Sequence, residues 1–291
     1  MDHANTASGS TRLATSTVST GTLRIPGAYL YYEVRGAGPL IALVGAPMDA
    51  TAFAPLADLL AADHTVLTTD PRGVHRSPVD YPDQDSTPEL RADDLARLIG
   101  HLGAGPATVL GSSGGAVTAL ALAQAHPNQV STLIAHEPPV TELLEDRELQ
   151  RAHTEEVIAT HLAGDLTGAW RKFLADANIH LPEPVFEQMF GPNRDPRLLA
   201  DEHHWFAHEM RATVRFEPDI AALRAAAART RIVVGIGEQS RGQICDRTSN
   251  ALAAALGIKP TLFPGGHIGF TEDPARFEAR LRELLDALGA S

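Results

Sequence analysis

Short β-type runs alternate with helical runs from Leu23 onward, and this alternation restricts the possible folds more than any other feature of the chain. Several β-type runs, such as Leu40–Val44, are apolar throughout, which is typical of strands covered on both faces in a parallel sheet. The helical runs, such as Leu90–Leu102 and Phe277–Leu288, carry apolar residues at three- and four-residue spacing. The predicted strands are Thr22–Ile25, Tyr29–Val34, Leu40–Val44, Thr65–Thr69, Ala107–Leu110, Ser131–Ile134, Arg231–Gly235 and Thr261–Phe263. The pattern predicts an α/β fold with a mostly parallel central sheet flanked by helices.

One long stretch interrupts the alternation. Residues 140–228 read as almost purely helical, which is too long for a simple crossover and too structured for a loop. We therefore predict a helical cap over 140–228, inserted after the sixth strand, and a core formed by residues 21–139 and 229–291. Residues 1–20 are rich in Ser and Thr and lack an apolar segment, so we expect a flexible tail there rather than a secretory signal.

Charge and cysteine content exclude several classes of partner and cofactor. The 291 residues include 24 Lys+Arg and 36 Asp+Glu, a net charge of −12, and no basic run, which argues against binding to nucleic acid or to an anionic membrane. No apolar stretch approaches the roughly 18 residues of a membrane span. Cys245 is the single cysteine, so an internal disulfide and a thiolate metal cluster are excluded, and we expect it to be inert. We expect a cytoplasmic protein with a small-molecule substrate; the sequence does not indicate its oligomeric state.

The strongest local signal is Gly111-Ser112-Ser113-Gly114-Gly115, between the run Ala107–Leu110 and a helical run. When a Gly-x-Ser-x-Gly segment connects a strand to a helix, the serine lies on a turn that is too tight for side chains at its flanks, and such a serine can act as a nucleophile. The hydroxyl then lies near a helix N-terminus, which favours developing negative charge. Ser113 is the predicted nucleophile; Ser112 lacks a glycine two positions to each side.

A serine nucleophile needs a base, and His267 is the best placed of the 13 histidines. It lies in the loop Pro264–Phe270, which follows the last predicted strand and is rich in glycine. Small neighbours allow an imidazole there to reach over the strand ends. We therefore predict that His267 is the general base.

The chain resembles the α/β-hydrolase superfamily of serine hydrolases with a helical cap. The likeness extends from about Leu23 to Leu288 and rests on the Gly-x-Ser-x-Gly turn, the Gly-Gly-His loop at 265–267, and the segment from Asp70 to Ser77, where His75 replaces a usual glycine. The resemblance implies the α/β-hydrolase fold, an acyl-enzyme mechanism, and no metal or organic cofactor.

The triad acid departs from the pattern of many relatives, which place an aspartate after the seventh strand. Ser240 occupies that position here. Glu137, in the His-Glu-Pro-Pro segment after the sixth strand, resembles the acid of fungal lactonases that open zearalenone, and it follows the required order of serine, acid and histidine. Glu137 is our prediction; Glu238 and Asp246 remain alternatives.

The resemblance also assigns the oxyanion donors to the N–H groups of Ala46 and Gly114, because Pro47 has no N–H. In the cap, Trp205 and Met189 are candidate pocket residues, together with Met48 from the loop after the third strand. His204 and His208 have a spacing that could hold a metal ion, but no third ligand is evident, so no metal site is predicted.

These features predict a serine hydrolase that cleaves a carboxylic ester or lactone through an acyl-enzyme. Halide-releasing and epoxide-opening relatives are disfavoured because they use an aspartate where this chain has Ser113. One alternative is a carbon–carbon bond hydrolase or a cofactor-free haloperoxidase on the same scaffold. Another is a non-catalytic protein that binds a small ligand, since fold alone does not specify function.

Overall fold

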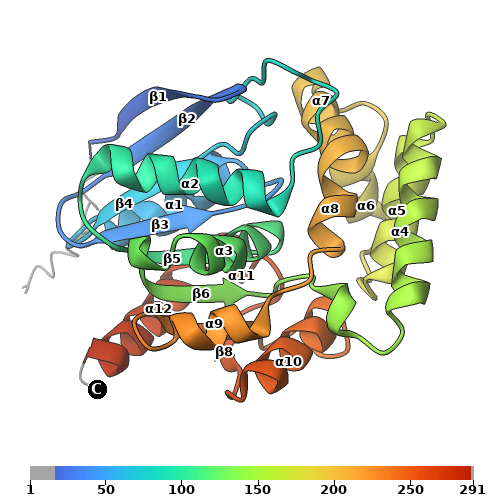
Figure 1. Cartoon of the computed structure of the whole chain (residues 1–291). Coiled ribbons are helices and arrows are strands. Elements are labelled where there is room, and N and C mark those ends of the chain that lie inside the picture. Colours follow the sequence, from blue (N-terminus) through green and yellow to red (C-terminus); the bar gives the residue numbers. More distant parts are fainter. Residues whose placement is uncertain (1–16, 290–291) are drawn as a thin grey trace, which may run out of the picture.

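A sheet with eight strands forms the centre of the protein in the computed structural model, which describes residues 17–289. The strand order is β1-β2-β4-β3-β5-β6-β7-β8, and every pair from β4 to β8 is parallel, whereas β1 and β2 pair in antiparallel fashion (Figure 1). The strands are β1 (Ser19–Ile25), β2 (Ala28–Arg35), β3 (Leu40–Val44), β4 (Thr65–Thr69), β5 (Ala107–Ser112), β6 (Val130–His136), β7 (Arg231–Gly237) and β8 (Thr261–Phe263). The predicted fold class is confirmed.

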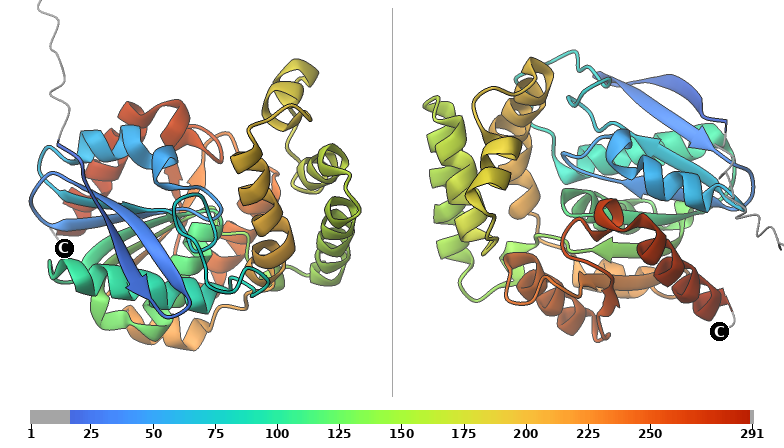
Figure 2. Two further views of the ribbon diagram at one scale, coloured as in Figure 1. Left: turned by 90° about the horizontal axis from the view of Figure 1, so that it is seen from above. Right: turned by 180° about the vertical axis from the view of Figure 1, so that it is seen from behind.

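Helices cover both faces of the sheet, which explains why the central strand β3 is apolar throughout. In β3, Ala42 and Val44 belong to one hydrophobic cluster, while Ile41 and Leu43 belong to a second on the opposite face. The first cluster includes α2 (Pro88–Leu102), α3 (Gly114–Ala125), α9 (Ile220–Ala226) and α10 (Ile244–Leu256). The second includes α1 (Ala50–Leu60), α11 (Gly269–Glu272) and α12 (Pro274–Gly289). Figure 2 shows the two layers from other sides.

The segment between β6 and β7 forms helices that stand beside the carboxyl ends of the parallel strands (Figure 1). After a short 3-10 turn these are α4 (Arg147–Leu162), α5 (Leu166–Asp176), α6 (Glu183–Phe190), α7 (Pro196–His204), a π-helical segment (Trp205–Glu209) and α8 (Met210–Val214). They have a hydrophobic cluster of their own around Phe206. In contrast, α9 packs against α3 and α10 and belongs through Leu223 to the first cluster, although it falls within the range 140–228 predicted for the cap.

The strand β1 begins earlier than expected. Ser19 and Thr20, which the sequence analysis placed in the tail, pair with Val34 and Glu33 of β2. Residues 1–16 of that predicted tail lie outside the described residues.

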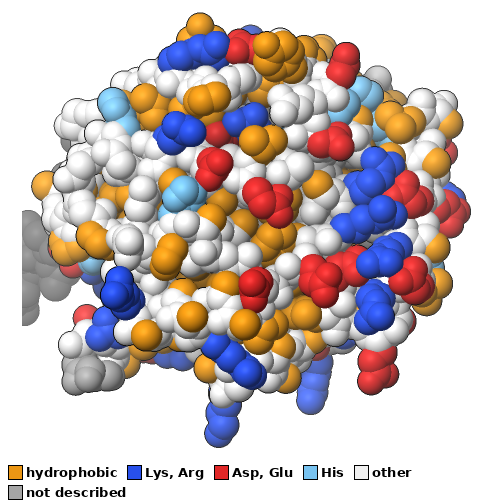
Figure 3. Space-filling view, in the orientation of Figure 1, with side chains coloured by type: hydrophobic (Ala, Val, Ile, Leu, Met, Phe, Trp, Pro, Cys, Tyr) orange, Lys and Arg blue, Asp and Glu red, His pale blue; other side chains and the backbone are white. Residues whose placement is uncertain are grey.

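Acidic and basic side chains are interspersed on the face shown in Figure 3, including the region of α4 and α5. Some of the charged side chains form ion pairs: Glu155 on α4 binds Arg211 and Arg215 at 2.8 Å. Within residues 17–289, no helix combines the length and the apolar character that crossing a membrane requires.

The loop between β4 and α2 connects the sheet to the helices beside it. Asp70 is fully buried, accepts the Ala50 N–H at 3.0 Å and binds Arg76. His75, which replaces a usual glycine, has a φ of 50°, and its N–H donates to Asp201 on α7 at 2.8 Å. His75 therefore contacts Asp201 while its own backbone has a positive φ, a conformation that favours glycine.

The helix α3 approaches the sheet more closely than a side chain would permit. A Cβ added to Gly115 would lie 2.0 Å from the carbonyl oxygen of Val44, and one added to Gly111 would lie 2.3 Å from the carbonyl oxygen of Gly115. Ten residues of α3, including both glycines at its start, are buried. The position of α3 therefore depends on glycine at these contacts.

Substitution of Gly115 by alanine tests this dependence. We expect Gly115→Ala to lower the free energy of unfolding by about 1–3 kcal/mol, because its Cβ would displace the backbone of β3. The matched control is Gly100→Ala, at an exposed position inside α2 with open space around the added Cβ, which should raise it by about 0.5–1 kcal/mol. Urea unfolding followed by circular dichroism measures both. Similar effects of the two substitutions would contradict the close-approach argument.

Candidate active site

The register of the parallel strands brings their outgoing loops to one edge of the sheet. Gly111 in β5 pairs with Val44 in β3 and with Ala135 in β6, so these three strands end at nearly the same level. The loops at this edge carry the candidate residues: Ala46 after β3, Ser113 after β5, Glu137 after β6 and His267 after β8. In open parallel sheets, such carboxyl-terminal edges are the usual location of ligand sites.

Ser113 occupies the predicted sharp turn between β5 and α3. Its φ of 56° and ψ of −126° lie in a region that side chains rarely adopt. Its N–H donates to the carbonyl oxygen of His136 at 3.0 Å, which continues the pairing of β5 with β6 through the turn. Ser113 lines a pocket together with His267, whereas Ser112 is buried with its Oγ 3.3 Å from Nδ1 of His136.

Glu137 holds the imidazole of His267. Its Oε2 accepts a hydrogen bond from Nδ1 of His267 at 2.6 Å, and its Oε1 accepts the N–H of Gly237 in β7 at 2.7 Å. Glu137 is fully buried and has a φ of 53°. Both carboxylate oxygens are thus occupied, so the orientation of the carboxylate is restricted and Nε2 of His267 is left for other contacts.

The pair shifts the pKa values of both partners. Burial alone would raise the pKa of Glu137, but the hydrogen bond from His267 and the charges of His267 and His136 lower it to about 2, with a small contribution from the buried hydroxyl of Ser240. Burial alone would lower the pKa of His267, but the Cys245 thiol and the Glu137 carboxylate raise it well above 6.5. The carboxylate therefore stays ionised over the whole physiological pH range.

The alternative acids lie elsewhere. Glu238 is half exposed and faces Arg276 at 3.9 Å. Asp246 accepts the N–H of Gly242 at 2.8 Å and a hydrogen bond from Asn250. Among the hydrogen bonds and ion pairs of residues 17–289, His267 has a carboxylate partner only in Glu137.

The two predicted oxyanion donors lie beside Ser113. Ala46 and Gly114 line the same pocket as Ser113 and His267. Gly114 is the first residue of α3, so its N–H has no acceptor within the helix and is available to a ligand. Among the described residues, the side-chain hydrogen bond of His267 is to Glu137, and none joins it to Oγ of Ser113.

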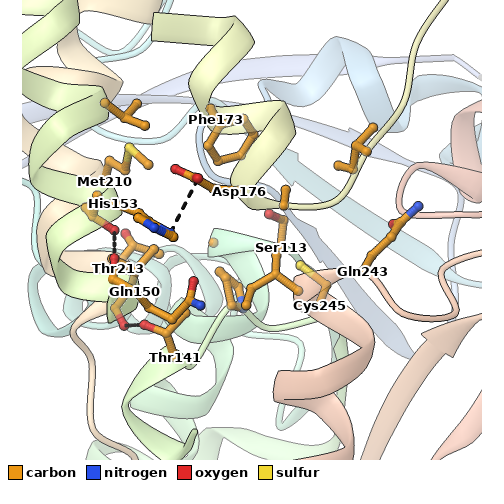
Figure 4. Close-up of a pocket in the computed structure, with 18 of the residues that line it drawn as sticks. Ser113, Thr141, Gln150, His153, Phe173, Asp176, Met210, Thr213, Gln243 and Cys245 are labelled. Atoms are coloured by element: carbon orange, nitrogen blue, oxygen red, sulfur yellow. Dashed lines mark hydrogen bonds and ion pairs between the residues drawn. The ribbon is translucent and has the colours of Figure 1, made fainter. Parts of the chain in front are cut away.

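The pocket lies between the sheet edge and the cap helices (Figure 4). Its wall includes Trp205, as predicted, with apolar residues from α4, α5 and α8. The structure corrects two other expectations. Met48 packs against the cluster of α1 and α11, and Met189 is 45% exposed on α6, so neither is among the described residues that line the pocket.

Cys245 lies inside the site, which the sequence could not indicate. It comes from the start of α10, and its Sγ, a carboxylate oxygen of Glu137 and a ring nitrogen of His267 all lie within 4.8 Å of one another. This spacing could accommodate a metal ion, whereas His204 and His208 have ring centroids 5.6 Å apart and lack a third ligand among the described residues. The absence of a metal and the inertness of Cys245 stay predictions.

Comparison with known proteins agrees with this geometry. The family described as "alpha/beta hydrolase fold" matches residues 38–178. An uncharacterized hydrolase of Bacillus subtilis, YraK, is 33% identical over 281 residues, which cover 93% of this chain and 97% of that protein. A zearalenone hydrolase of Cladophialophora bantiana is 34% identical over 113 residues, 38% of this chain and 43% of that protein.

The fold recurs in solved structures. A hydrolase from Pseudomonas aeruginosa superimposes with a TM-score of 0.66 and 24% identity, covering 91% of this chain and 98% of that one. The similarity to YraK over nearly the whole of both chains, together with the family match and the sheet order, shows that this chain is a hydrolase of the α/β-hydrolase superfamily.

Proposed function

We propose that the protein hydrolyses carboxylic esters, including lactones, through an acyl-enzyme formed on Ser113. The observation that carries the proposal is the hydrogen bond of 2.6 Å between Glu137 and His267, in a pocket that Ser113 also lines. A serine, a histidine and a buried carboxylate in this relation are the parts that acyl transfer requires.

In the first half-reaction, Nε2 of His267 takes the proton of the Ser113 hydroxyl while Oγ forms a bond to the carbonyl carbon of the ester. The negative charge that develops on the carbonyl oxygen is stabilised by the N–H groups of Ala46 and Gly114. Glu137 holds His267 in the tautomer that presents Nε2 and stabilises the imidazolium. The imidazolium then gives its proton to the leaving alcohol as the ester bond breaks.

In the second half-reaction, His267 takes a proton from water, and the hydroxide attacks the acyl carbon. The bond between the acyl carbon and Oγ breaks, the proton returns to Ser113, and the carboxylic acid leaves. A lactone follows the same steps, with the alcohol and the acid remaining in one molecule. The local similarity to a zearalenone hydrolase supports including this subclass.

The nucleophile is tested with a fluorophosphonate probe and p-nitrophenyl butyrate. We expect the wild-type protein to be labelled, and Ser113→Ala to lose labelling and at least about 10³-fold in kcat/KM, because the hydroxyl that attacks the ester is gone. Ser112→Ala is the matched control and should keep the label. Labelling of Ser113→Ala at the wild-type level would exclude Ser113 as the nucleophile.

The acid is tested by Glu137→Gln. We expect kcat to fall by about 10²–10⁴, because a neutral amide neither stabilises the imidazolium nor selects the tautomer of His267. Glu238→Gln removes an exposed acid after β7 and should leave kcat unchanged. The same p-nitrophenyl assay measures both variants. A larger loss in Glu238→Gln than in Glu137→Gln would move the acid to the loop after β7.

The raised pKa of His267 predicts the pH profile. Only the neutral imidazole accepts the proton of Ser113, so kcat/KM should rise with pH through an apparent pKa above 6.5. Cys245→Ala removes one of the groups that raise this pKa and should move the midpoint to lower pH. Measurement of kcat/KM against pH for both proteins checks this. A wild-type midpoint below 6.5 would refute it.

A further inference from the structure

A histidine and a carboxylate face the pocket from the cap. Nδ1 of His153 on α4 lies 3.4 Å from Oδ1 of Asp176, the last residue of α5. Both residues line the pocket and keep about a third of their side-chain surface exposed. Figure 4 shows the pair across the pocket from Ser113. Among the described residues, Nδ1 of His153 has no hydrogen-bond partner although it is shielded from solvent.

The surroundings make this pair costly as a purely structural feature. The neighbouring wall is apolar and includes Val157, Phe173 and Met210. Polar groups beside such a wall lose hydration, and a gap of 3.4 Å recovers little of that loss. The contact between α4 and α5 is made in any case by Val157 and Ala169 in the cap cluster and by the pairing of Lys172 with Glu156.

Four other polar side chains that line the pocket are hydrogen-bonded within the protein. Thr141 donates to the carbonyl oxygen of Val214, and Gln150 donates to Asp146. Thr154 donates to the carbonyl oxygen of Gln150, and Thr213 accepts from Arg91. His153 and Asp176 therefore retain free hydrogen-bonding capacity on the side of the pocket opposite Ser113.

We propose that His153 and Asp176 form a hydroxyl subsite, which binds a hydroxyl group at the end of the substrate remote from the scissile ester. A hydroxyl donates to the carboxylate of Asp176 and accepts from the N–H at Nε2 of His153, since Nδ1 is shielded from solvent, so it matches both groups at once. A free carboxylate would be repelled by Asp176, and the described lining residues include no Lys or Arg to bind it. The inference rests on the proposed ester hydrolysis at Ser113 and adds the chemical class of the substrate.

The test uses p-nitrophenyl alkanoates in matched pairs, each ending in a hydroxyl or in a methyl group, over a series of chain lengths. We expect wild-type kcat/KM to favour the hydroxyl ester roughly tenfold at the length that spans the pocket, the effect of one or two well-formed hydrogen bonds. His153→Phe and Asp176→Leu, which remove the proposed donor and acceptor, should bring the ratio of the two rates close to one. His126→Phe removes a histidine from another pair with an aspartate, Asp93, on the surface, and should keep the wild-type ratio.

A ratio near one at every length in the wild type, or a hydroxyl preference that survives both pocket substitutions, would overturn the subsite. Failure of the ester hydrolysis itself is recognised separately, because then neither ester reacts. In that case, the preference for a hydroxyl is measured by binding, without turnover. The ligands are non-hydrolysable ketones that end in a hydroxyl or in a methyl group. Their binding is followed by tryptophan fluorescence, to which Trp205 in the pocket wall contributes. A hydroxyl preference in binding retains the subsite, and equal binding removes it.

Discussion

The close contact of α3 with the central strands is the constraint on which the rest of the site depends. Only glycine fits at positions 111 and 115, where an added Cβ would collide with backbone oxygens. This contact places the start of α3 directly beyond β5, and the chain makes the connection through the unusual backbone angles of Ser113. The position of Ser113 in the pocket and the available N–H of Gly114 both follow from helix packing, so one contact determines the stability of the fold and the placement of the proposed nucleophile.

Glu137, the proposed acid, follows β6 rather than β7, and this position determines how its carboxylate is supported. Because β6 is the strand next to β5, Glu137 follows the strand beside the one that leads to Ser113, and its carboxylate reaches across to His267. The second carboxylate oxygen of Glu137 accepts a hydrogen bond from the N–H of Gly237 at the end of β7, so β7 also orients this carboxylate. Ser240, where many relatives carry the acid, is small and buried, and leaves room for the glutamate.

The sequence predicts the sheet and the local turns well, because these follow from short-range patterns. The strand ranges, the serine turn and the loop of His267 are all encoded within a few residues of one another. The cap interior follows from contacts between residues far apart in the chain, so Met48 and Met189 were wrong pocket candidates and the His153–Asp176 pair gave no signal. The position of Cys245 in the site was not predicted for the same reason: only the packing of α10 brings it beside His267.

Within residues 17–289, the cap helices and the sheet have separate hydrophobic clusters. Trp205 and Phe206 belong to a cluster with residues of α4, α5 and α8, while the sheet has its own clusters on its two faces. Polar contacts such as that of His75 with Asp201 connect the two parts. Mutations that reshape the cap interior can therefore accumulate without disturbing the register that aligns Ser113, Glu137 and His267. In evolution, such a protein can acquire new substrates while its reaction chemistry is conserved.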